Sequence, residues 1–266
     1  MICGNGRFPI LALETAAKLG HDVVAVGIQE EAAPEIESHA PRTYWISLGE
    51  LSKLIEILKR EQITEVLFCG QVKHTKIFSA IRPDWRLAKL LLSLREKNTD
   101  ALIGGVAKVL ADEGISLGDS TRLLKPLLAE ERVMTRRKPD HEEERDIGYG
   151  RRVATALAGF DVGQSVAVAE RACVALEAME GTDAMLQRAA SLVNGKALRL
   201  VKSSRRRKHL QFDVPVVGPD TIRAMQQTGT TALAVDAGRT LLLDKAEMLS
   251  LADVAGISVI GLKPEE

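Results

Sequence analysis

The chain has 266 residues, of which 45% are apolar and 27% charged, a composition typical of a globular protein with one large domain or two smaller ones. Lysine and arginine together number 36, as do aspartate and glutamate, so no net charge would recruit nucleic acid or an anionic membrane. No apolar run reaches the roughly 18 residues of a spanning helix, and the N-terminus lacks the features of a secretory signal. We therefore expect neither a membrane span nor a secretory leader.

The cysteines also indicate a compartment. Cys3, Cys69 and Cys173 form an odd set in mostly apolar surroundings, with no Cys-x-x-Cys pair. This pattern is typical of buried, reduced thiols and not of disulfides or a zinc site. The sequence therefore predicts a cytoplasmic protein.

In the first half, short β-branched runs alternate with amphipathic stretches, which indicates an open α/β sheet with parallel strands. Gly20 is placed to end the first helix. Strands are predicted at 22–26, 65–68 and 115–117, and helices at 9–19, 48–59, 84–94 and 100–110.

The composition becomes highly charged between Glu130 and Glu144, which indicates a domain boundary. We predict an N-terminal Rossmann-like domain with an open parallel sheet (1–131) and a C-terminal mixed α/β domain (132–266). In the second domain, strands are predicted at 165–168, 173–176, 198–201, 212–217, 232–235 and 240–243, and helices at 147–158, 183–190, 219–227 and 245–255.

Gly4, Gly6 and Pro9 form a turn between a first strand and a first helix. Two glycines let the backbone approach a phosphate, and the helix N-terminus offers N–H donors. A dinucleotide fingerprint would need glycine where Pro9 stands and an acidic residue where Gly27 stands. The turn therefore indicates a phosphate site or no ligand, and only weakly NAD. Few residues precede Gly4, so we expect a short, weakened first strand, and an upstream start is one explanation.

Three carboxylates, those of Glu177, Glu180 and Asp183, surround a predicted helix start. Thr182 is predicted to cap this helix, whose first turn offers N–H groups to an anion. Two interpretations remain open. The residues alone favour solvated acids beside a cap, and the alternative is a site for a hard cation such as Mg²⁺.

Asp213 lies in a strongly apolar segment, Phe-Asp-Val-Pro-Val-Val at 212–217. In a strand its side chain would point away from the face shared by Phe212 and Val214. A buried carboxylate is strongly unfavourable unless it is paired. We therefore predict a partner for Asp213, and the residues alone leave open whether it is a structural salt bridge or a functional group.

Residues 202–209 form a strongly basic run that begins with Lys202, directly after a predicted strand. No aromatic side chain is interleaved with the run, so bases lack a stacking platform and nucleic acid is not an expected partner. Most of the run is expected to be a solvated loop, in which Lys202 is best placed to face a ligand. The turn at 161–165 offers the backbone of Gly163 and the amide of Gln164 to a phosphate or nucleobase.

Several segments, in order over nearly the whole chain, resemble those of one family. They are Gly4-Asn5-Gly6-Arg7-Phe8-Pro9, Phe68-Cys69-Gly70-Gln71-Val72, Thr99-Asp100-Ala101-Leu102, Asp161-Val162-Gly163-Gln164-Ser165-Val166, Glu177-Ala178-Met179-Glu180-Gly181-Thr182-Asp183-Ala184-Met185 and Phe212-Asp213-Val214-Pro215. On these segments the chain resembles the LpxI-type UDP-2,3-diacylglucosamine pyrophosphatases of Gram-negative bacteria.

The resemblance implies a two-domain cytosolic hydrolase of lipid A and lipopolysaccharide synthesis that converts UDP-2,3-diacylglucosamine to lipid X and UMP. In that family water attacks the α-phosphorus with Mg²⁺ present and the lipid product sits between the domains, so the resemblance implies the same here, with Mn²⁺ as an alternative metal. The family's catalytic aspartate matches Asp213, which we expect to hold the metal. From its chemistry, Asp183 is the predicted second metal ligand, and Glu180 is the alternative second carboxylate, as ligand or as base. The predicted substrate-binding residues are Gly4, Asn5, Gly6, Gly70, Gln71, Asp100, Gly163, Gln164, Ser165, Glu180, Gly181, Thr182 and Lys202.

The implied partner is a lipid-linked UDP-sugar, collected by transient contact with the inner face of the inner membrane. A homodimer is compatible with the sequence, which does not determine the oligomeric state. The run at Arg205–Lys208 is more basic than the family pattern, which weakens the assignment of Lys202. Two alternatives stay open: a nucleotide-dependent oxidoreductase built on the N-terminal glycine turn, and a non-enzymatic lipid- or nucleic-acid-binding protein built on the basic run.

Overall fold

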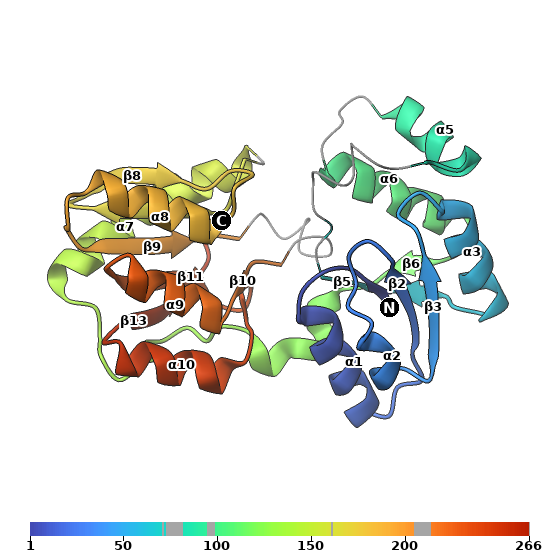
Figure 1. The fold of residues 1–266 in the computed structure, drawn as a ribbon, viewed down its shortest axis with the longest axis horizontal. Helices are drawn as coiled ribbons and strands as arrows, with labels where there is room; N and C mark the ends of the chain where they lie inside the picture. The colour runs from blue at the N-terminus through green and yellow to red at the C-terminus, as the bar shows by residue number, and fades with distance from the viewer. Residues whose placement is uncertain (71, 73–81, 95–98, 161, 205–213, 266) are drawn as a thin grey trace. The chain divides into compact units, whose positions relative to one another are not determined.

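The structure is a computed structural model that describes residues 1–70, 72, 82–94, 99–160, 162–204 and 214–265. The chain divides into two compact units, Met1–Leu124 and Lys125–Glu266 (Figure 1). The division falls a few residues before the boundary that the composition predicts. The predicted α/β class is confirmed, with a parallel sheet in the first unit and a mixed sheet in the second. Among the described residues, no helix has both the length and the hydropathy needed to cross a bilayer.

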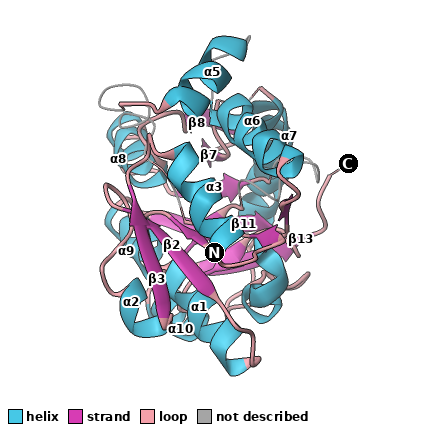
Figure 2. Cartoon of the chain, turned by 90° about the vertical axis from the view of Figure 1, so that its right-hand side faces the viewer, coloured by secondary structure: helices cyan, strands magenta, loops and turns pink. Residues whose placement is uncertain are grey.

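The N-terminal unit is built on a four-stranded parallel sheet with the order β3-β2-β1-β5. The expected shortness of the first strand is confirmed, since β1 is a two-residue strand in the interior of this sheet. Strands β2 and β3 run side by side at the edge (Figure 2). The strands are β1 (Ile2–Cys3), β2 (Val24–Ile28), β3 (Arg42–Ile46) and β5 (Phe68–Cys69), and β4 (Glu65–Val66) pairs separately with β6 (Ser116–Leu117).

Helices cover both faces of this sheet. The cluster of Leu13, Ile36 and Cys3 joins α1 (Phe8–Lys18) and α2 (Ile36–His39) to one face. The opposite face packs against α3 (Leu51–Arg60), α5 (Trp85–Ser93) and α6 (Thr99–Asp112). As predicted, Pro9 lies in the first turn of α1 and Gly20 follows the end of that helix with a φ of 74°. A 3₁₀ segment at Ser120–Leu127 leads into the second unit.

The cysteines are free, as the sequence predicts. Cys3 and Cys69 are buried and are direct neighbours on β1 and β5, whereas Cys173 is half-buried. Burial raises the pKa of Cys3 to about 11 and that of Cys69 to about 12. Thiols with such pKa values remain protonated and unreactive at neutral pH.

The C-terminal unit is built on a five-stranded mixed sheet with the order β13-β11-β9-β7-β8. Strands β13, β11 and β9 are parallel, and β7 is antiparallel to both β9 and β8. The strands are β7 (Ser165–Ala169), β8 (Ala172–Leu176), β9 (Leu198–Lys202), β11 (Thr230–Asp236) and β13 (Ser258–Leu262), and β10 (Val216–Val217) pairs separately with β12 (Leu241–Leu242).

Alternate residues of the strands face two different helix layers. Val166 and Val201 pack against α7 (His141–Gly159). Ala167 and Leu200 pack on the opposite face, which is covered by α8 (Thr182–Leu192), α9 (Pro219–Gln227) and α10 (Lys245–Val254) (Figure 1). Because side chains alternate along a strand, the first residue of β7 and the last residue of β9 also belong to the α8 face.

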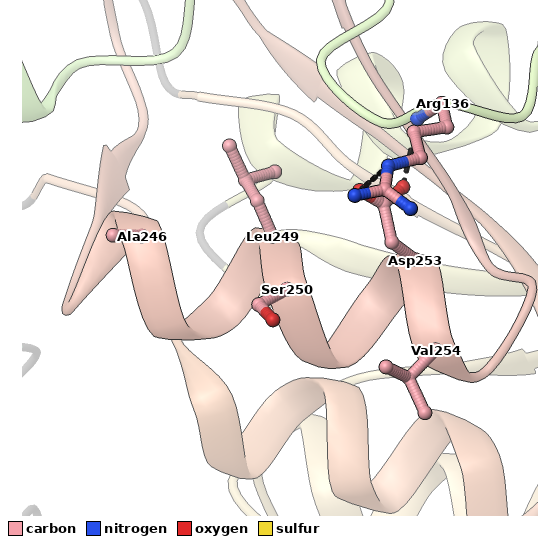
Figure 3. Close-up of a pocket in the computed structure, with 6 residues that line it drawn as sticks. All are labelled: Arg136, Ala246, Leu249, Ser250, Asp253 and Val254. Atoms are coloured by element: carbon pink, nitrogen blue, oxygen red, sulfur yellow. Dashed lines mark hydrogen bonds and ion pairs between the residues drawn. The ribbon is translucent and has the colours of Figure 1, made fainter.

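The extended segment before α7 runs beside β13, where Met134 N donates to Val259 O (2.8 Å). The next residues reach the end of α10. There the Arg136 N–H donates to Asp253 (2.7 Å), and a surface cavity of about 340 Å³ is lined by this pair and by other α10 residues (Figure 3).

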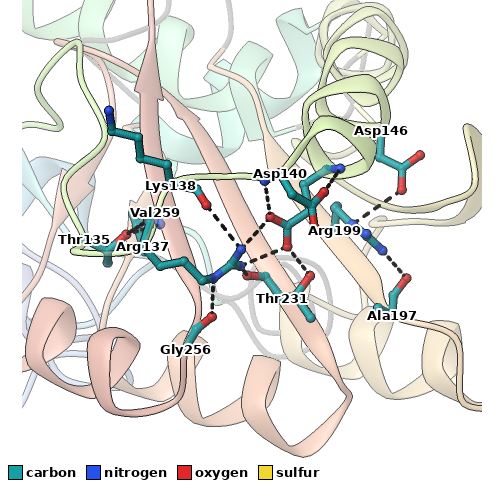
Figure 4. A network of polar contacts seen from close by, with 11 residues as sticks. Thr135, Arg137, Lys138, Asp140, Asp146, Ala197, Arg199, Thr231, Gly256 and Val259 are labelled. Carbon is teal, nitrogen blue, oxygen red and sulfur yellow. Dashed lines mark hydrogen bonds and ion pairs between the residues drawn. The ribbon is translucent and has the colours of Figure 1, made fainter.

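Arg137 ties this segment to the rest of the unit (Figure 4). Its guanidinium donates to both carboxylate oxygens of Glu143 (2.7 and 2.9 Å), to Thr231 O (2.6 Å) and to Gly256 O (2.6 Å). Glu143 is 2% exposed and also closes a capping box with Asp140. Burial by itself would raise the pKa of Glu143, but hydrogen bonds from Arg137, Thr231 and the Asp140 N–H outweigh it and lower this pKa. The pair therefore stabilises the unit as an ion pair.

We predict that Arg137→Ala lowers the free energy of unfolding of the C-terminal unit by about 2–3 kcal/mol, because it leaves the Glu143 carboxylate buried without its cation. Arg136→Ala is the matched control, since the Arg136 side chain is 91% exposed and should contribute less than about 0.5 kcal/mol. Urea unfolding should be followed by far-UV circular dichroism, because Trp45 and Trp85 both belong to the other unit. Equal stabilities of the two variants would contradict the prediction.

The effect of Arg137→Ala should also depend on pH. A carboxylate with a lowered pKa stabilises the folded state above its unfolded value of about 4.5, and this stabilisation is lost as the pH falls through the folded-state pKa. The stability gap between wild type and Arg137→Ala should therefore be constant near neutral pH and narrow below pH 4.5. A gap that stayed constant down to pH 3 would show that the ion pair is not its source.

Candidate functional site

The N-terminal glycine turn lies at the carboxyl edge of the first sheet. Gly4 N donates to Cys69 O (2.8 Å), and Gly70, with a φ of 90°, packs so closely that an added Cβ would lie 2.5 Å from Asn5 O. The structure therefore brings the predicted residues Gly4, Asn5 and Gly70 together, and Gly6 follows in the same turn. Gln71 lies outside the described residues, and Asp100 lies in the first turn of α6, where its side chain is not described.

A second group of predicted residues meets at the carboxyl edge of β9 in the C-terminal unit. Because β7 is antiparallel to β9, its first residue, Ser165, lies opposite Lys202, the last residue of β9. Glu177, which follows β8, donates its N–H to Ser165 O (2.9 Å). The carboxyl ends of parallel strands are the usual ligand-binding edge of open α/β sheets.

Four polar side chains at this edge form what we call the lysine cluster: Lys202, Ser165, Thr182 and Glu177. The ammonium of Lys202 donates to the hydroxyls of Ser165 (3.1 Å) and Thr182 (3.2 Å). Thr182 Oγ1 donates to Glu177 Oε1 (2.7 Å), and Glu177 Oε2 lies 3.7 Å from the Lys202 Nζ. The cluster thus joins β7, β9, the end of β8 and the start of α8.

The charges of the cluster compensate each other in a buried position. Lys202 is 8% and Glu177 9% exposed. Burial by itself would raise the pKa of Glu177, but the Lys202 charge and hydrogen bonds from Ser165, Thr182 and the Gln164 N–H outweigh it and lower this pKa. An ammonium has three N–H donors, and only two have hydrogen-bond acceptors among the residues that the structure describes. Among the described residues, Glu177 Oε2 lies next to this ammonium at 3.7 Å, which is beyond hydrogen-bond distance.

The turn at 163–165 is held against the cluster by a very close backbone approach. A Cβ on Gly163 would lie 2.0 Å from Glu177 O, so only glycine fits there. Gln164 O accepts a hydrogen bond from Ser203 N (2.9 Å), which attaches the turn to the residue after β9. The predicted residues Gly163, Gln164 and Ser165 therefore do contribute to one structural site.

The expectation that Thr182 caps α8 is wrong. Gly181, with a φ of 85°, occupies the N-cap position, and Thr182 is the first helical residue, whose hydroxyl contacts Glu177 and Lys202. Of the three nearby carboxylates, Glu177 belongs to the lysine cluster and Glu180 does not. Glu180 turns away to Arg188 (2.6 Å) and to Ala178 N (3.0 Å). Glu180 therefore lies outside the lysine cluster.

Comparison with known proteins gives the family. A family model described as the LpxI N-terminal domain matches residues 1–127, and one described as the LpxI C-terminal domain matches residues 130–260. The chain belongs to the LpxI family. A relative from Caulobacter vibrioides, named UDP-2,3-diacylglucosamine pyrophosphatase LpxI, is 29% identical over 276 residues, covering 100% of this chain and 98% of the relative. The resemblance read from the sequence is thereby confirmed.

Asp183 is the described member of the predicted metal ligand set, in which the LpxI resemblance implies only Asp213. Burial raises its pKa, and the charges of Asp220 and Glu177 raise it further, while Lys202 acts in the opposite direction. A bound cation would relieve this repulsion. The described part of the chain contains no group of three or more histidine, cysteine or acidic side chains arranged to hold a metal. Magnesium, however, needs only one or two protein carboxylates when phosphate and water complete its shell.

Asp213, the predicted catalytic residue of this LpxI chain, lies outside the described residues. The predicted strand at 212–217 is observed only as β10, which begins at Val216. The cavity on α10 is lined by none of the predicted site residues.

Glu177 was not among the predicted site residues, although its carboxylate was noted near the start of the helix. Its position directly after a strand, five residues before Thr182, was the available signal.

We predict that Gly163→Ala destabilises the C-terminal unit by about 1–3 kcal/mol, because the added methyl group would overlap the Glu177 carbonyl. Gly159→Ala is the matched control. It lies four residues earlier at the end of α7, where an added Cβ meets no atom within 4 Å, and it should be neutral or slightly stabilising. Thermal unfolding followed by circular dichroism measures both. Equal melting temperatures for the two variants would contradict the close approach.

Proposed function

We propose that this chain hydrolyses the pyrophosphate bond of UDP-2,3-diacylglucosamine to lipid X (2,3-diacylglucosamine 1-phosphate) and UMP, by attack of water on the α-phosphorus, in lipid A biosynthesis. The observation that carries the proposal is the lysine cluster, a buried ammonium held by two hydroxyls and a carboxylate at the carboxyl edge of a sheet. Membership of the LpxI family and the name of the Caulobacter relative support this substrate.

In this proposal Lys202 binds an oxygen of the pyrophosphate. A charged donor held in a buried site binds an oxyanion more strongly than an exposed, mobile lysine does, because its charge is less screened and its position is already fixed. The first-turn amides of α8 lie beside it and carry partial positive charge, which favours the same ligand. This chain's residues thus orient the diphosphate and stabilise negative charge that develops on its oxygens.

Asp213 is the catalytic carboxylate in the proposal, as the family resemblance implies. Mg²⁺, with Mn²⁺ as the alternative, would be held by Asp213 and Asp183, and when bound it supplies charge neutralisation at the phosphoryl oxygens. The raised pKa of Asp183 supports this role, since burial and then the charges of Asp220 and Glu177 disfavour its ionised form, which a bound cation would favour.

Exposed apolar side chains on the neighbouring loops support a lipid-bearing substrate. Phe160 and Val162 precede β7, and Met179 lies between β8 and α8, so all three belong to the loops that lead into the lysine cluster. Large exposed apolar side chains near a polar site are suited to acyl chains or to a bilayer surface. We therefore also propose that this chain is cytoplasmic and contacts the inner face of the inner membrane transiently.

We expect Lys202→Gln to lower kcat/KM for UDP-2,3-diacylglucosamine by about 100-fold, because it removes a charged hydrogen bond to the reacting group. Lys196→Gln is the control, since Lys196 is an exposed lysine paired with Glu170 in the same unit. UMP release in the presence of Mg²⁺ and detergent measures the rates. A folded Lys202→Gln variant with wild-type kcat/KM would exclude this lysine from the site.

We expect Asp213→Ala to lower kcat by at least about 1,000-fold, because enzymes typically lose activity on this scale when a catalytic carboxylate is removed. Chelation of divalent ions from the wild-type protein should abolish UMP release, and added Mg²⁺ or Mn²⁺ should restore it. Circular dichroism verifies that the variant is folded. Wild-type turnover by Asp213→Ala would refute its catalytic role, and full activity in excess chelator would refute the metal.

A further inference from the structure

The lysine cluster contains a carboxylate, that of Glu177, which is not among the predicted catalytic, metal-binding or substrate-binding residues. Glu177 is buried, its N–H is bound to Ser165 O, and the close approach of Gly163 fixes its backbone. Its two oxygens face Thr182 (2.7 Å) and Lys202 (3.7 Å). The carboxylate is thus held in one place by several independent contacts.

The hydroxyl protons of the cluster are directed toward Glu177. Thr182 has a single hydroxyl proton, and it is donated to Glu177 Oε1. Thr182 therefore cannot donate to Ser165 Oγ, 3.4 Å away, and the single proton of Ser165 is left for Thr182 Oγ1 or for the Glu177 carboxylate. Both hydroxyls accept a hydrogen bond from the Lys202 ammonium. Their protons thus face the carboxylate, and their lone pairs face Lys202.

From this geometry we propose that Glu177 is a positioning residue. It directs the hydroxyls of Thr182 and Ser165 so that they hold the Lys202 ammonium and leave its third N–H for a phosphoryl oxygen of the substrate. Ser165 and Thr182 then act on the substrate through Lys202, since their protons are already engaged inside the cluster. This inference rests on the proposed function for the identity of the substrate, but the arrangement itself concerns any diphosphate at this edge.

The carboxylate charge is essential to this arrangement. An amide at position 177 can donate as well as accept, so the Thr182 hydroxyl is free to reverse and the chain of hydrogen bonds loses its direction. The ammonium also loses its buried counter-charge. Both effects act on Lys202, and neither should matter once Lys202 is absent.

The test is a double-mutant cycle of Glu177→Gln and Lys202→Gln, measured as kcat/KM for UDP-2,3-diacylglucosamine. We expect Glu177→Gln alone to lower kcat/KM by about 10-fold or more, and to have less than about a 2-fold effect in the Lys202→Gln background. The surface pair Glu170 and Lys196, at a distance of 2.7 Å, provides a control cycle that should leave kcat/KM unchanged. The inference is overturned if the fold-losses of kcat/KM caused by Glu177→Gln and Lys202→Gln simply multiply in the double variant. It is also overturned if Glu177→Gln alone has the kcat/KM of the wild type.

A second set of variants covers the case in which Glu177→Gln does not fold. Thr182→Ser keeps the hydroxyl that links Lys202 to Glu177, so its kcat/KM should stay within about 3-fold of wild type. The isosteric Thr182→Val removes this hydroxyl, and its kcat/KM should fall by as much as that of Glu177→Gln. A Thr182→Val variant as active as Thr182→Ser would overturn the inference.

Binding of inorganic pyrophosphate, followed by calorimetry, separates this inference from the proposed function. If the wild-type protein releases no UMP, the proposed function is wrong. The same double-mutant cycle is then measured as changes in the Kd for pyrophosphate. Coupled effects of Glu177→Gln and Lys202→Gln on this Kd support the positioning role. Independent effects, or no effect of Glu177→Gln on a measurable Kd, contradict it.

Discussion

The buried ammonium of Lys202 sets the main constraint on the C-terminal unit. A charge with this little exposure is strongly unfavourable unless nearby groups compensate it. The compensation comes from three other elements: the start of β7, the residue after β8 and the start of α8. These elements can converge only because β7 lies antiparallel between β9 and β8, which brings the first residue of one strand to the last residues of the two others.

Strand β9 contains a second buried cation, and the comparison shows why position along the strand matters. Arg199 points to the opposite face, where its Nε lies 3.5 Å from Asp146 of α7, and its Nη1 donates to Ala197 O (2.7 Å). This pair lies toward the amino end of β9 and joins a helix to the sheet. Lys202 lies at the carboxyl end, where open α/β sheets bind ligands. The same strand therefore carries an ion pair that joins elements and another that is placed to meet a ligand.

Much of this architecture could be predicted from local sequence signals. Helix α9 was predicted with the observed bounds, because Gly218 and Pro219 mark its start clearly. The grouping of Gly163–Ser165 with Lys202 followed from the family resemblance, and the structure brings them together. Strand β3 was not predicted, since Arg42 and Thr43 give it a half-exposed, polar start.

The departures from the local sequence signals have a common physical cause, which is that the partners of a side chain come from other elements. Thr182 has the residue type of a helix cap, but its hydroxyl is engaged by Glu177 and by Lys202, twenty residues further on. Glu180 precedes α8 and pairs with Arg188 of that helix. Residue type alone does not identify these partners. The role of Glu177 was hidden for the same reason, because the hydroxyl and the ammonium that define it come from other elements.

The geometry of the lysine cluster is fixed by the protein's own hydrogen bonds. The residues after β9 are attached on both sides: Ser203 N donates to Gln164 O (2.9 Å), and Ser204 donates from its N (2.7 Å) and its hydroxyl (2.9 Å) to Asp236 at the end of β11. Lys202 is thus held by its own strand, by both neighbouring strands and by the two hydroxyls. Little further ordering of this side chain is needed on binding, so more of the interaction with an oxyanion is available as affinity or as stabilisation of developing charge. The parallel and antiparallel neighbours of β9 are therefore as much a part of the site as the lysine itself.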